Sequence, residues 1–311
     1  MGIVRKEFFQ SNNGIDKIHY ICWEPSKIEV KAVVQIAHGM VEHIERYDEF
    51  ANFLNNEGIV VVGNDHLGHG NSVRDNNKYG FFSNENGDEY LIEDMRSLFI
   101  RTKEKYSNVP YILFGHSMGS FLTRKYISKY SDDLDGVIIC GTGNQSRATI
   151  NIGQKVVRFL IKLKGEEYRS KLVDNLAFGG YNKKFQPART SKDWLSSDSK
   201  MVDEYLQDKK CDFIFTLSAY RDLFSVIDFV SKVHNIESIR KSIPVLFIAG
   251  NMDPVGNFGK GVEEVYNKFK SAGIRDVSLK LYDGKRHEIL NEVDKEEVYK
   301  DVVLWVEHII N

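Results

Sequence analysis

The sequence is poor in cysteine and has no long apolar run. Its three cysteines, Cys22, Cys140 and Cys211, are odd in number and widely spaced, which predicts neither a disulfide framework nor a zinc site. Each is expected to be a small apolar residue of a reducing compartment. No apolar stretch approaches the length of a membrane span, and the N-terminal residues lack the apolar core of a signal peptide. These absences predict a cytoplasmic protein.

An excess of charge of one sign is also absent. The 311 residues carry 42 Lys and Arg against 44 Asp and Glu, which gives a formal net charge of −2. Because no long basic run occurs, binding to nucleic acid has little electrostatic support, and we expect no nucleic-acid partner. The sequence leaves the oligomeric state open.

What is present is a regular alternation of short apolar runs and helical patterns. An antiparallel hairpin is predicted first, from Lys6–Gln10 and Lys17–Trp23 around a turn-like Ser-Asn-Asn-Gly segment. Buried strands then alternate with helices: strands at Ala32–Ala37, Ile59–Gly63, Tyr111–Phe114 and Val137–Cys140, and helices at Tyr47–Asn56, Tyr90–Tyr106 and Met118–Tyr130. This order predicts an α/β fold, with a mostly parallel twisted sheet and helices on both of its faces.

The alternation stops after Gly143 and resumes at Ile243. Residues 144–235 are mostly helical in pattern, with a loop-like stretch at 179–198 and no run typical of a buried strand. The later elements are predicted strands at Ile243–Ala249 and Val277–Tyr282 and predicted helices at Gly261–Ala272 and Lys295–Ile310. We therefore expect one core domain, residues 1–143 and 236–311, interrupted by a helical cap, residues 144–235.

A sharp turn is predicted where the strand Tyr111–Phe114 runs into Gly115-His116-Ser117-Met118-Gly119. These residues match G-x-S-x-G, the motif in which a serine nucleophile occupies a strained strand-to-helix turn. Glycine at each end of the motif avoids a collision with the neighbouring strand and helix. Because an apolar strand precedes the motif and a helical pattern follows it, Ser117 is the candidate nucleophile. The alternative is a tight glycine turn with an inert serine.

A serine hydroxyl needs a base, and the base needs a group that fixes its tautomer. For this motif the chain order is serine, acid, histidine. His287 follows the predicted strand that ends at Tyr282, at the edge where active-site residues of parallel sheets gather. His308 lies in the last turn of the closing helix, where a cation near a helix C-terminus is a sufficient explanation. His287 is therefore the candidate base.

Two aspartates are candidates for the acid. Asp253 closely follows the predicted strand Ile243–Ala249, which places it at the same carboxyl edge of the sheet. Asp283 is nearer to His287 in sequence, but it belongs to an Asp-Gly pair, which is typical of a turn. We expect Asp253 to complete the triad, with Asp283 as the alternative.

A tetrahedral intermediate carries an oxyanion, which two backbone N–H groups stabilise. One donor is expected to be Met118, directly after the nucleophile, and the other Met40, in the loop before the first large helix. Four further histidines lie in loops near this edge and are out of chain order for the base: His38, His66, His69 and His116. We expect these to pack or to bind loop backbone.

Six segments together resemble the monoacylglycerol lipase and lysophospholipase group of α/β-hydrolases. They are HGMVEHIERY (38–47), DHLGHGNS (65–72), GHSMG (115–119), RTSKDWLSSD (189–198), AGNMDPVG (249–256) and RHEILNE (286–292). The resemblance runs in order from about residue 15 to the C-terminus. Asp193-Trp194-Leu195 and Cys211-Asp212-Phe213 are most similar to bacterial lysophospholipases.

The resemblance implies the fold of that group and a triad of Ser117, Asp253 and His287, with Met40 and Met118 as oxyanion donors. It implies a two-step acyl transfer through an acyl-enzyme, with no metal or organic cofactor, on the ester of a single-chain lipid. The lipases of the group carry a small residue where this chain has Met40, so the size of the acyl pocket is left open.

One stretch of the predicted cap crowds apolar residues: Val156, Val157, Phe159, Leu160 and Ile161. Such a stretch either buries an acyl tail, at about 0.8 kcal/mol per methylene, or packs on the core domain. The sequence leaves both interpretations open. Transient contact with a membrane through the cap is a further expectation.

Two other functions stay open at this point. A serine aminopeptidase or amidase would need a carboxylate in the cap for the substrate ammonium, and Glu166, Glu167 and Glu204 are available. A non-catalytic binding module on the same fold usually lacks a triad residue, whereas all three candidates are present here.

Overall fold

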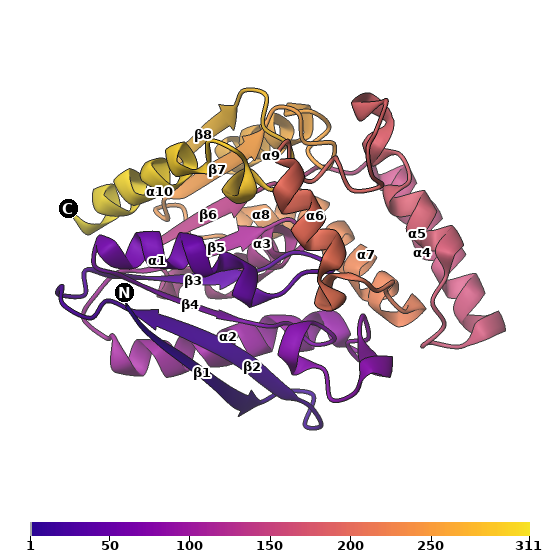
Figure 1. Ribbon diagram of the computed structural model, residues 1–311, viewed down its shortest axis with the longest axis horizontal. Coiled ribbons are helices and arrows are strands. Elements are labelled where there is room, and N and C mark those ends of the chain that lie inside the picture. Colours follow the sequence, from indigo (N-terminus) through magenta and orange to yellow (C-terminus); the bar gives the residue numbers. More distant parts are fainter. Residues whose placement is uncertain (1) are drawn as a thin grey trace.

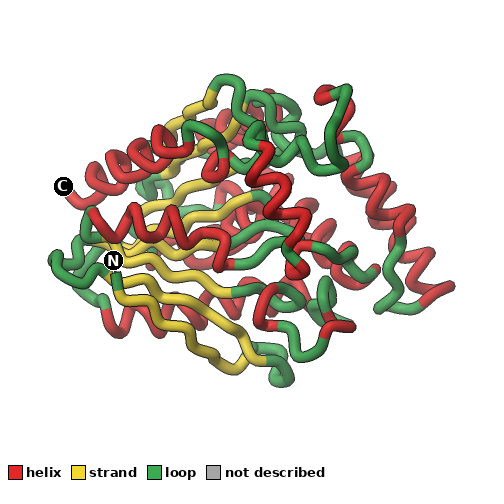
Figure 2. Tube along the Cα trace, viewed as in Figure 1, coloured by secondary structure: helices red, strands yellow, loops and turns green. Residues whose placement is uncertain are grey.

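The computed structural model describes residues 2–311, and its centre is one eight-stranded sheet (Figure 1, Figure 2). The strands are β1 (Ile3–Gln10), β2 (Lys17–Glu24), β3 (Ala32–Ala37), β4 (Ile59–Asn64), β5 (Tyr111–His116), β6 (Gly136–Cys140), β7 (Val245–Gly250) and β8 (Val277–Tyr282). Their spatial order is β1-β2-β4-β3-β5-β6-β7-β8. β2 pairs antiparallel with β1 and β4, and the other pairings are parallel. The predicted α/β class is confirmed.

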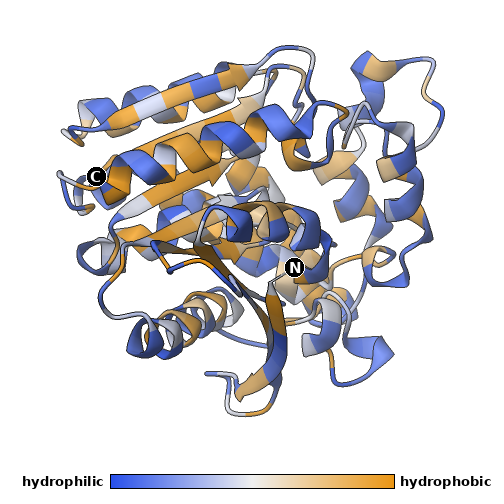
Figure 3. Ribbon diagram, turned by 60° about the vertical axis from the view of Figure 1, so that its left-hand side comes forward, coloured by the Kyte–Doolittle hydropathy of each residue, from blue (hydrophilic) through white to orange (hydrophobic). Residues whose placement is uncertain are grey.

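Helices cover both faces of the sheet. α1 (Asp48–Asn56) and α10 (Lys295–Ile310) pack into one apolar cluster, and α2 (Gly87–Lys105), α3 (Met118–Tyr130) and α9 (Lys260–Ser271) pack into the other. Successive strand residues point to opposite faces. In β6, Val137 and Ile139 join one cluster, while Ile138 joins the other. Both faces are therefore apolar, and Figure 3 shows hydrophobic residues along the strands and hydrophilic ones on the outer sides of the helices.

Residues 144–235, called the insertion below, lie beyond the carboxyl ends of the parallel strands (Figure 1). They contain α4 (Arg147–Lys164), α5 (Lys171–Phe178), α6 (Ser199–Gln207), α7 (Leu217–Ser231) and the start of α8 (Val233–Glu237). The first four helices each begin after a residue whose side chain accepts a helix N–H: Ser146, Ser170, Asp198 and Thr216. A short 3₁₀ helix, Tyr181–Phe185, lies in the stretch that was expected to be loop.

A buried arginine binds the chain just before the insertion and near its end. Arg124 of α3 is 3% exposed, and its guanidinium donates to the carbonyl oxygens of Gly143 at 3.1 Å and Val230 at 2.9 Å. Burial lowers the pKa of Arg124 to about 9. The two hydrogen bonds of Arg124 link this part of the chain to α3, the helix that begins directly after Ser117.

Element boundaries depart from the sequence-based prediction by two or three residues in four places. β1 begins at Ile3 instead of Lys6. β7 begins at Val245 instead of Ile243, because the preceding Pro244 has no N–H to donate to a strand ladder. β5 continues to His116 because Gly115 and His116 still pair with β6. α2 begins at Gly87, three residues earlier than expected.

The turn from β5 into α3 is as tight as the motif predicts. Ser117 has φ 54° and ψ −119°, which is a strained conformation for a residue with a side chain. A Cβ on Gly115 would lie 2.2 Å from Thr123 Oγ1, and a Cβ on Gly119 would lie 1.9 Å from the carbonyl oxygen of Ala37. Glycine is required at both positions because no side chain fits between α3, β5 and the end of β3.

Replacing Gly119 by alanine is expected to destabilise the fold by at least about 3 kcal/mol, because the clash is with backbone rather than with a flexible side chain. The free energy of unfolding in urea measures this loss. Gly180→Ala is the matched control, since no heavy atom lies within 4 Å of a Cβ there. Equal stability of the two variants would contradict the explanation.

Candidate active site

The loops after β7 and β8 bring an aspartate and a histidine together. His287 Nδ1 lies 2.9 Å from Asp253 Oδ2, and both side chains are buried. The second oxygen of Asp253 accepts the N–H of Val255 at 2.8 Å, which fixes the carboxylate. A Cβ on Gly250 would lie 2.0 Å from the carbonyl oxygen of Lys285, so the two loops touch through their backbones. A carboxylate that binds Nδ1–H leaves Nε2 free to accept a proton.

The rival residues lie elsewhere. Asp283 is exposed and accepts a hydrogen bond from the Asn251 amide at 2.7 Å rather than from His287. His308 is exposed in the last turn of α10. Neither side chain contributes to the pair formed by Asp253 and His287.

Ser117 lies beside this pair. Its N–H donates to the carbonyl oxygen of Cys140, the last residue of β6, at 3.0 Å. A Cβ on the next residue, Gly141, would lie 3.3 Å from His287 Cε1. The serine and the imidazole thus flank the same strand end, although no hydrogen bond joins their side chains among residues 2–311. Hydrogen bonds of this kind are often long without substrate and tighten when it binds.

In the loop after β3, the N–H groups on either side of Met40 are both bound. The N–H of Gly39 donates to the Glu42 carboxylate, and the N–H of Val41 donates to His69 Nε2 at 3.3 Å. Between them, the N–H of Met40 has no acceptor among the described residues. Met118 is the first residue of α3, so its N–H has no partner within the helix. Neither predicted donor therefore has an acceptor among residues 2–311.

Neutral histidines orient this loop. The N–H of His66 donates to His38 Nε2 at 3.0 Å, so the ring proton of His38 is on Nδ1, which donates to the Gly39 carbonyl at 2.8 Å. Because the peptide bond is trans, the N–H of Met40 points away from that carbonyl. Burial lowers the pKa of His38 well below its ordinary value and that of His69 to about 4, which keeps their acceptor nitrogens unprotonated.

A buried ionic cluster lies behind the site, and the sequence reasoning did not assign it. Arg46 donates to Glu288 with both terminal nitrogens, at 2.8 and 2.7 Å, and to Glu42 at 2.9 Å. Tyr47 donates to Glu42 at 3.0 Å. The sequence does single these residues out, because Glu42 and Arg46 lie in HGMVEHIERY and Glu288 lies in RHEILNE, two of the six segments that carry the family resemblance. The cluster joins the loop after β3 to the loop that carries His287.

His116 completes the charge balance of this cluster. Its Nδ1 lies 3.2 Å from Glu42 and its Nε2 lies 3.3 Å from the carbonyl oxygen of His287. Both partners are acceptors, so both ring nitrogens carry protons and the imidazole is a cation. Burial lowers the pKa of His116, but the Glu42 carboxylate outweighs burial and holds that pKa above its ordinary value. The carboxylates of Glu42 and Glu288 are then balanced by the cations of Arg46 and His116.

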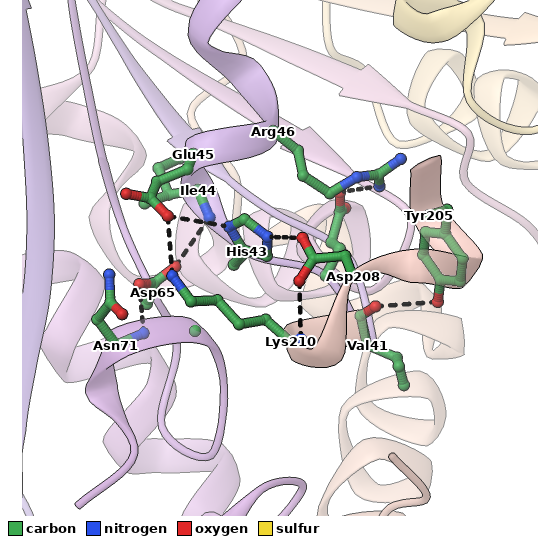
Figure 4. Close-up of polar contacts among 12 residues, drawn as sticks. Val41, His43, Ile44, Glu45, Arg46, Asp65, Asn71, Tyr205, Asp208 and Lys210 are labelled. Atoms are coloured by element: carbon green, nitrogen blue, oxygen red, sulfur yellow. Dashed lines mark hydrogen bonds and ion pairs between the residues drawn. The ribbon is translucent and has the colours of Figure 1, made fainter. Parts of the chain in front are cut away.

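One group of the described residues has the composition of a metal site. His43, Asp208 and Cys211 offer ligand atoms that lie within 4.8 Å of one another. His43 Nε2 already binds Asp208 at 2.7 Å, and the Lys210 ammonium binds Glu45 at 2.9 Å beside them (Figure 4). Positive charge at this place opposes a divalent cation. We interpret the group as a polar link between the insertion and the loop after β3.

A pH dependence of stability follows from His116. A group whose pKa is raised by folding stabilises the fold fully below its unfolded pKa, about 6.5 for imidazole, and loses this contribution as pH rises through the folded value. The unfolding free energy of the wild type should therefore exceed that of His116→Gln most below about pH 6.5. The difference should shrink at higher pH, and a constant difference in urea titrations would contradict a charged His116.

Comparisons with known proteins find relatives that are named lipases and esterases. Rat monoglyceride lipase is 25% identical over 295 residues, which cover 92% of this chain and 85% of the rat protein. Monoacylglycerol lipase of Mycolicibacterium smegmatis is 25% identical and covers 97% of each chain. The crystal structure of a thermostable carboxyl esterase from Bacillus coagulans in complex with glycerol superposes with a TM-score of 0.93, at 29% identity and with full coverage of both chains.

The sequence profile of the family described as "Serine aminopeptidase, S33" matches residues 28–294, which is most of the chain. The matched range includes the turn at Ser117, the loops of Asp253 and His287, and the whole insertion. The protein therefore belongs to this family of α/β-hydrolases.

Proposed function

We propose that the protein is a serine hydrolase that cleaves carboxylic esters of single-chain lipids, as a monoacylglycerol lipase or a lysophospholipase does. The observation that carries the proposal is the buried hydrogen bond between Asp253 and His287 beside the strained Ser117 turn. The relatives named monoglyceride and monoacylglycerol lipases, and the carboxyl esterase bound to glycerol, support an ester of this kind.

In the proposed reaction Ser117 Oγ attacks the ester carbonyl while His287 Nε2 takes its proton. Asp253 holds Nδ1 and stabilises the imidazolium. The N–H groups of Met40 and Met118 bind the oxyanion. His287 then protonates the leaving alcohol, and the same residue activates the water that hydrolyses the acyl-enzyme. Every step uses groups of this chain, so the proposed reaction requires no metal or organic cofactor.

We further propose that residues 144–235 form a cap over a core domain of residues 1–143 and 236–311. Hydrogen bonds between the insertion and the loop of His287 support this arrangement. The N–H of Glu288 donates to the Leu195 carbonyl at 2.7 Å, and the Ser196 hydroxyl donates to the Asn291 carbonyl at 2.8 Å. The insertion thus lies directly against the candidate base.

The apolar stretch of α4 does not act as one surface. Val157 is fully buried and joins the main core cluster, which agrees with packing on the rest of the protein. Phe159 is 62% exposed and points outward. The stretch from Val156 to Ile161 is therefore divided between a packed and an outward face, and we do not assign the acyl tail to it.

The pairing and exposure of three glutamates disfavour an aminopeptidase, which would need one of them to bind the substrate ammonium. Glu166 is paired with Arg221 at 3.0 Å, and Glu167 is paired with Lys78 at 2.6 Å. Glu204 is more than half exposed, with Lys200 at 3.8 Å. None of the three is a buried, unpaired carboxylate that would hold a substrate ammonium. A non-catalytic binding module is disfavoured because Ser117, Asp253 and His287 are all present.

We also propose that the insertion makes transient contact with lipid surfaces. Ile152, Phe159 and Leu163 of α4 and Leu172 and Leu176 of α5 are each more than half exposed. α4 in addition carries five Lys and Arg residues and no Asp or Glu. A basic amphipathic helix of this kind favours an anionic bilayer surface.

No helix within residues 2–311 has the length and apolar character needed to cross a bilayer. A cytoplasmic location stays part of the proposal. It is supported by the three cysteines, which are buried and unpaired as a reducing compartment allows.

The ester preference can be tested with p-nitrophenyl esters and aminoacyl anilides offered to the same enzyme. We expect hydrolysis of the esters, labelling of Ser117 by a fluorophosphonate, and loss of both in Ser117→Ala. Asp253→Asn should reduce kcat by about 10⁴, because the imidazole would then take the wrong tautomer. Faster cleavage of the anilides would favour the aminopeptidase, and the absence of any labelling would favour the binding module.

Membrane contact can be tested by sedimentation with phosphatidylglycerol vesicles. Phe159→Glu combined with Leu163→Glu should weaken binding at least about ten-fold, because each buried apolar side chain contributes about 1.5–3 kcal/mol. The melting temperature should change little, since both side chains are exposed. Leu304→Glu on α10 is the control, being 63% exposed and outside the insertion. An equal loss of vesicle binding in Leu304→Glu would contradict the proposal that the insertion is the contact surface.

A further inference from the structure

We propose that the insertion is a working part of the oxyanion site, because Tyr205 of α6 holds the loop that presents the N–H of Met40. Tyr205 is a positioning residue in this proposal, since it does not touch the reacting atoms. The proposal rests on the function proposed above and extends it. It assigns to the insertion a role in the chemical step, beyond enclosing the substrate.

Four side chains anchor the backbone on either side of Met40. His38 donates to the carbonyl of Gly39, and Glu42 accepts the N–H of Gly39. His69 accepts the N–H of Val41, and the hydroxyl of Tyr205 donates to the carbonyl of Val41 at 2.9 Å (Figure 4). Three of these anchors come from the core, and Tyr205 comes from the insertion. The position of the Met40 N–H therefore depends on a contact that the core alone does not make.

The anchor acts on a strained residue. Val41 has φ 57°, which costs of order 1–3 kcal/mol for a β-branched side chain. Such a conformation persists only where surrounding contacts hold it. The N–H and the carbonyl of Val41 are each bound by a side chain, so removal of the Tyr205 hydroxyl frees one end of the strained residue.

Tyr205 is itself firmly placed. It is 5% exposed and packs in a small apolar cluster with Trp194, Leu195, Cys211 and Val255. The guanidinium of Arg46 lies 5.0 Å from the centre of its ring. Its hydroxyl is thus presented to Val41 by side chains of both the insertion and the core.

Two further contacts fix the same part of the insertion to the same loop. Asp208 binds His43 at 2.7 Å, and Lys210 binds Glu45 at 2.9 Å, on residues that follow Val41 in the chain (Figure 4). Displacement of α6 from the core would break these links together with the Tyr205 bond. The position of α6 is therefore coupled to the geometry of the oxyanion loop.

The insertion also contacts the candidate base. The ring centre of Trp194 lies 5.1 Å from the ring centre of His287. The ring centre of His116, which belongs to the core, lies 4.8 Å from that of His287. The N–H of Glu288 is bound by the carbonyl of Leu195. Residues of the insertion thus contact both the loop that carries Met40 and the candidate base His287.

This role makes a different prediction from simple enclosure of the substrate. A cover for the acyl tail affects long-chain esters and acts mainly on KM. An anchor of the oxyanion loop affects the charge that develops on the carbonyl oxygen of every ester, and so acts on kcat.

The test compares Tyr205→Phe with the wild type on p-nitrophenyl acetate, butyrate and decanoate. Phenylalanine keeps the ring and its packing and removes only the hydroxyl. We expect kcat to fall by roughly 10- to 100-fold, to a similar extent on all three esters, with KM within about two-fold. The rate of fluorophosphonate labelling of Ser117 should fall in parallel, because the phosphonyl oxygen occupies the same site.

Tyr220→Phe is the matched control, since it removes a hydroxyl of the insertion that binds Asp174 at 2.7 Å, within the insertion. Its kcat should equal that of the wild type. Unchanged kcat in Tyr205→Phe, or a loss confined to decanoate, would overturn the proposal. A wild-type protein that hydrolyses none of the esters would instead refute the proposed function. The melting temperatures of both variants show whether a loss of kcat comes from unfolding instead.

Discussion

The end of β3 and the start of α3 are in direct backbone contact, and the geometry of the candidate site depends on this contact. A Cβ on Gly119 would lie 1.9 Å from the carbonyl oxygen of Ala37, and a Cβ on Gly39 would lie 3.1 Å from the Cβ of Ser117. Only glycine allows two chain segments to approach this closely. We propose that this approach places the N–H groups of Met40 and Met118 beside Ser117, where they would bind the oxyanion.

Buried charges hold the loops around this contact. Arg46 binds Glu42 and Glu288, which follow different strands, and His116 binds Glu42 from within the turn that carries the serine. Leaving any one of these ions buried without its partner would cost several kcal/mol, so the loops are constrained to one arrangement. The same carboxylate of Glu42 also accepts the N–H of Gly39, which links the ionic cluster to the oxyanion loop.

The insertion is bound to the loops that it covers. Its 193–197 segment lies along the loop of His287. Tyr205 of α6, and Asp208 and Lys210 just after α6, bind the loop after β3. Its outer helices α4 and α5 instead present exposed apolar and basic side chains. One side of the insertion thus supports the proposed chemistry, and the other side supports the proposed contact with a lipid surface.

The sequence by itself determined the features that depend on neighbouring residues. Apolar runs predicted the parallel strands of the core, because a strand buried on both faces has no polar side, and the glycines around Ser117 predicted the tight turn. The G-x-S-x-G motif predicted Ser117, and positions directly after strands predicted Asp253 and His287. The structure joins Asp253 and His287 by a hydrogen bond. β7 begins two residues later than the apolar run predicts, because Pro244 has no N–H for the strand ladder.

Only the tertiary structure decided which distant side chains share a buried space. Arg46 and Glu288 are 242 residues apart, and Tyr205 and Val41 are 164 residues apart. No periodicity or spacing connects such pairs, because their contact depends on how the loops and the insertion pack at one edge of the sheet. The same holds for the charge of His116, whose pKa is set by the burial and by the carboxylate that folding places beside it.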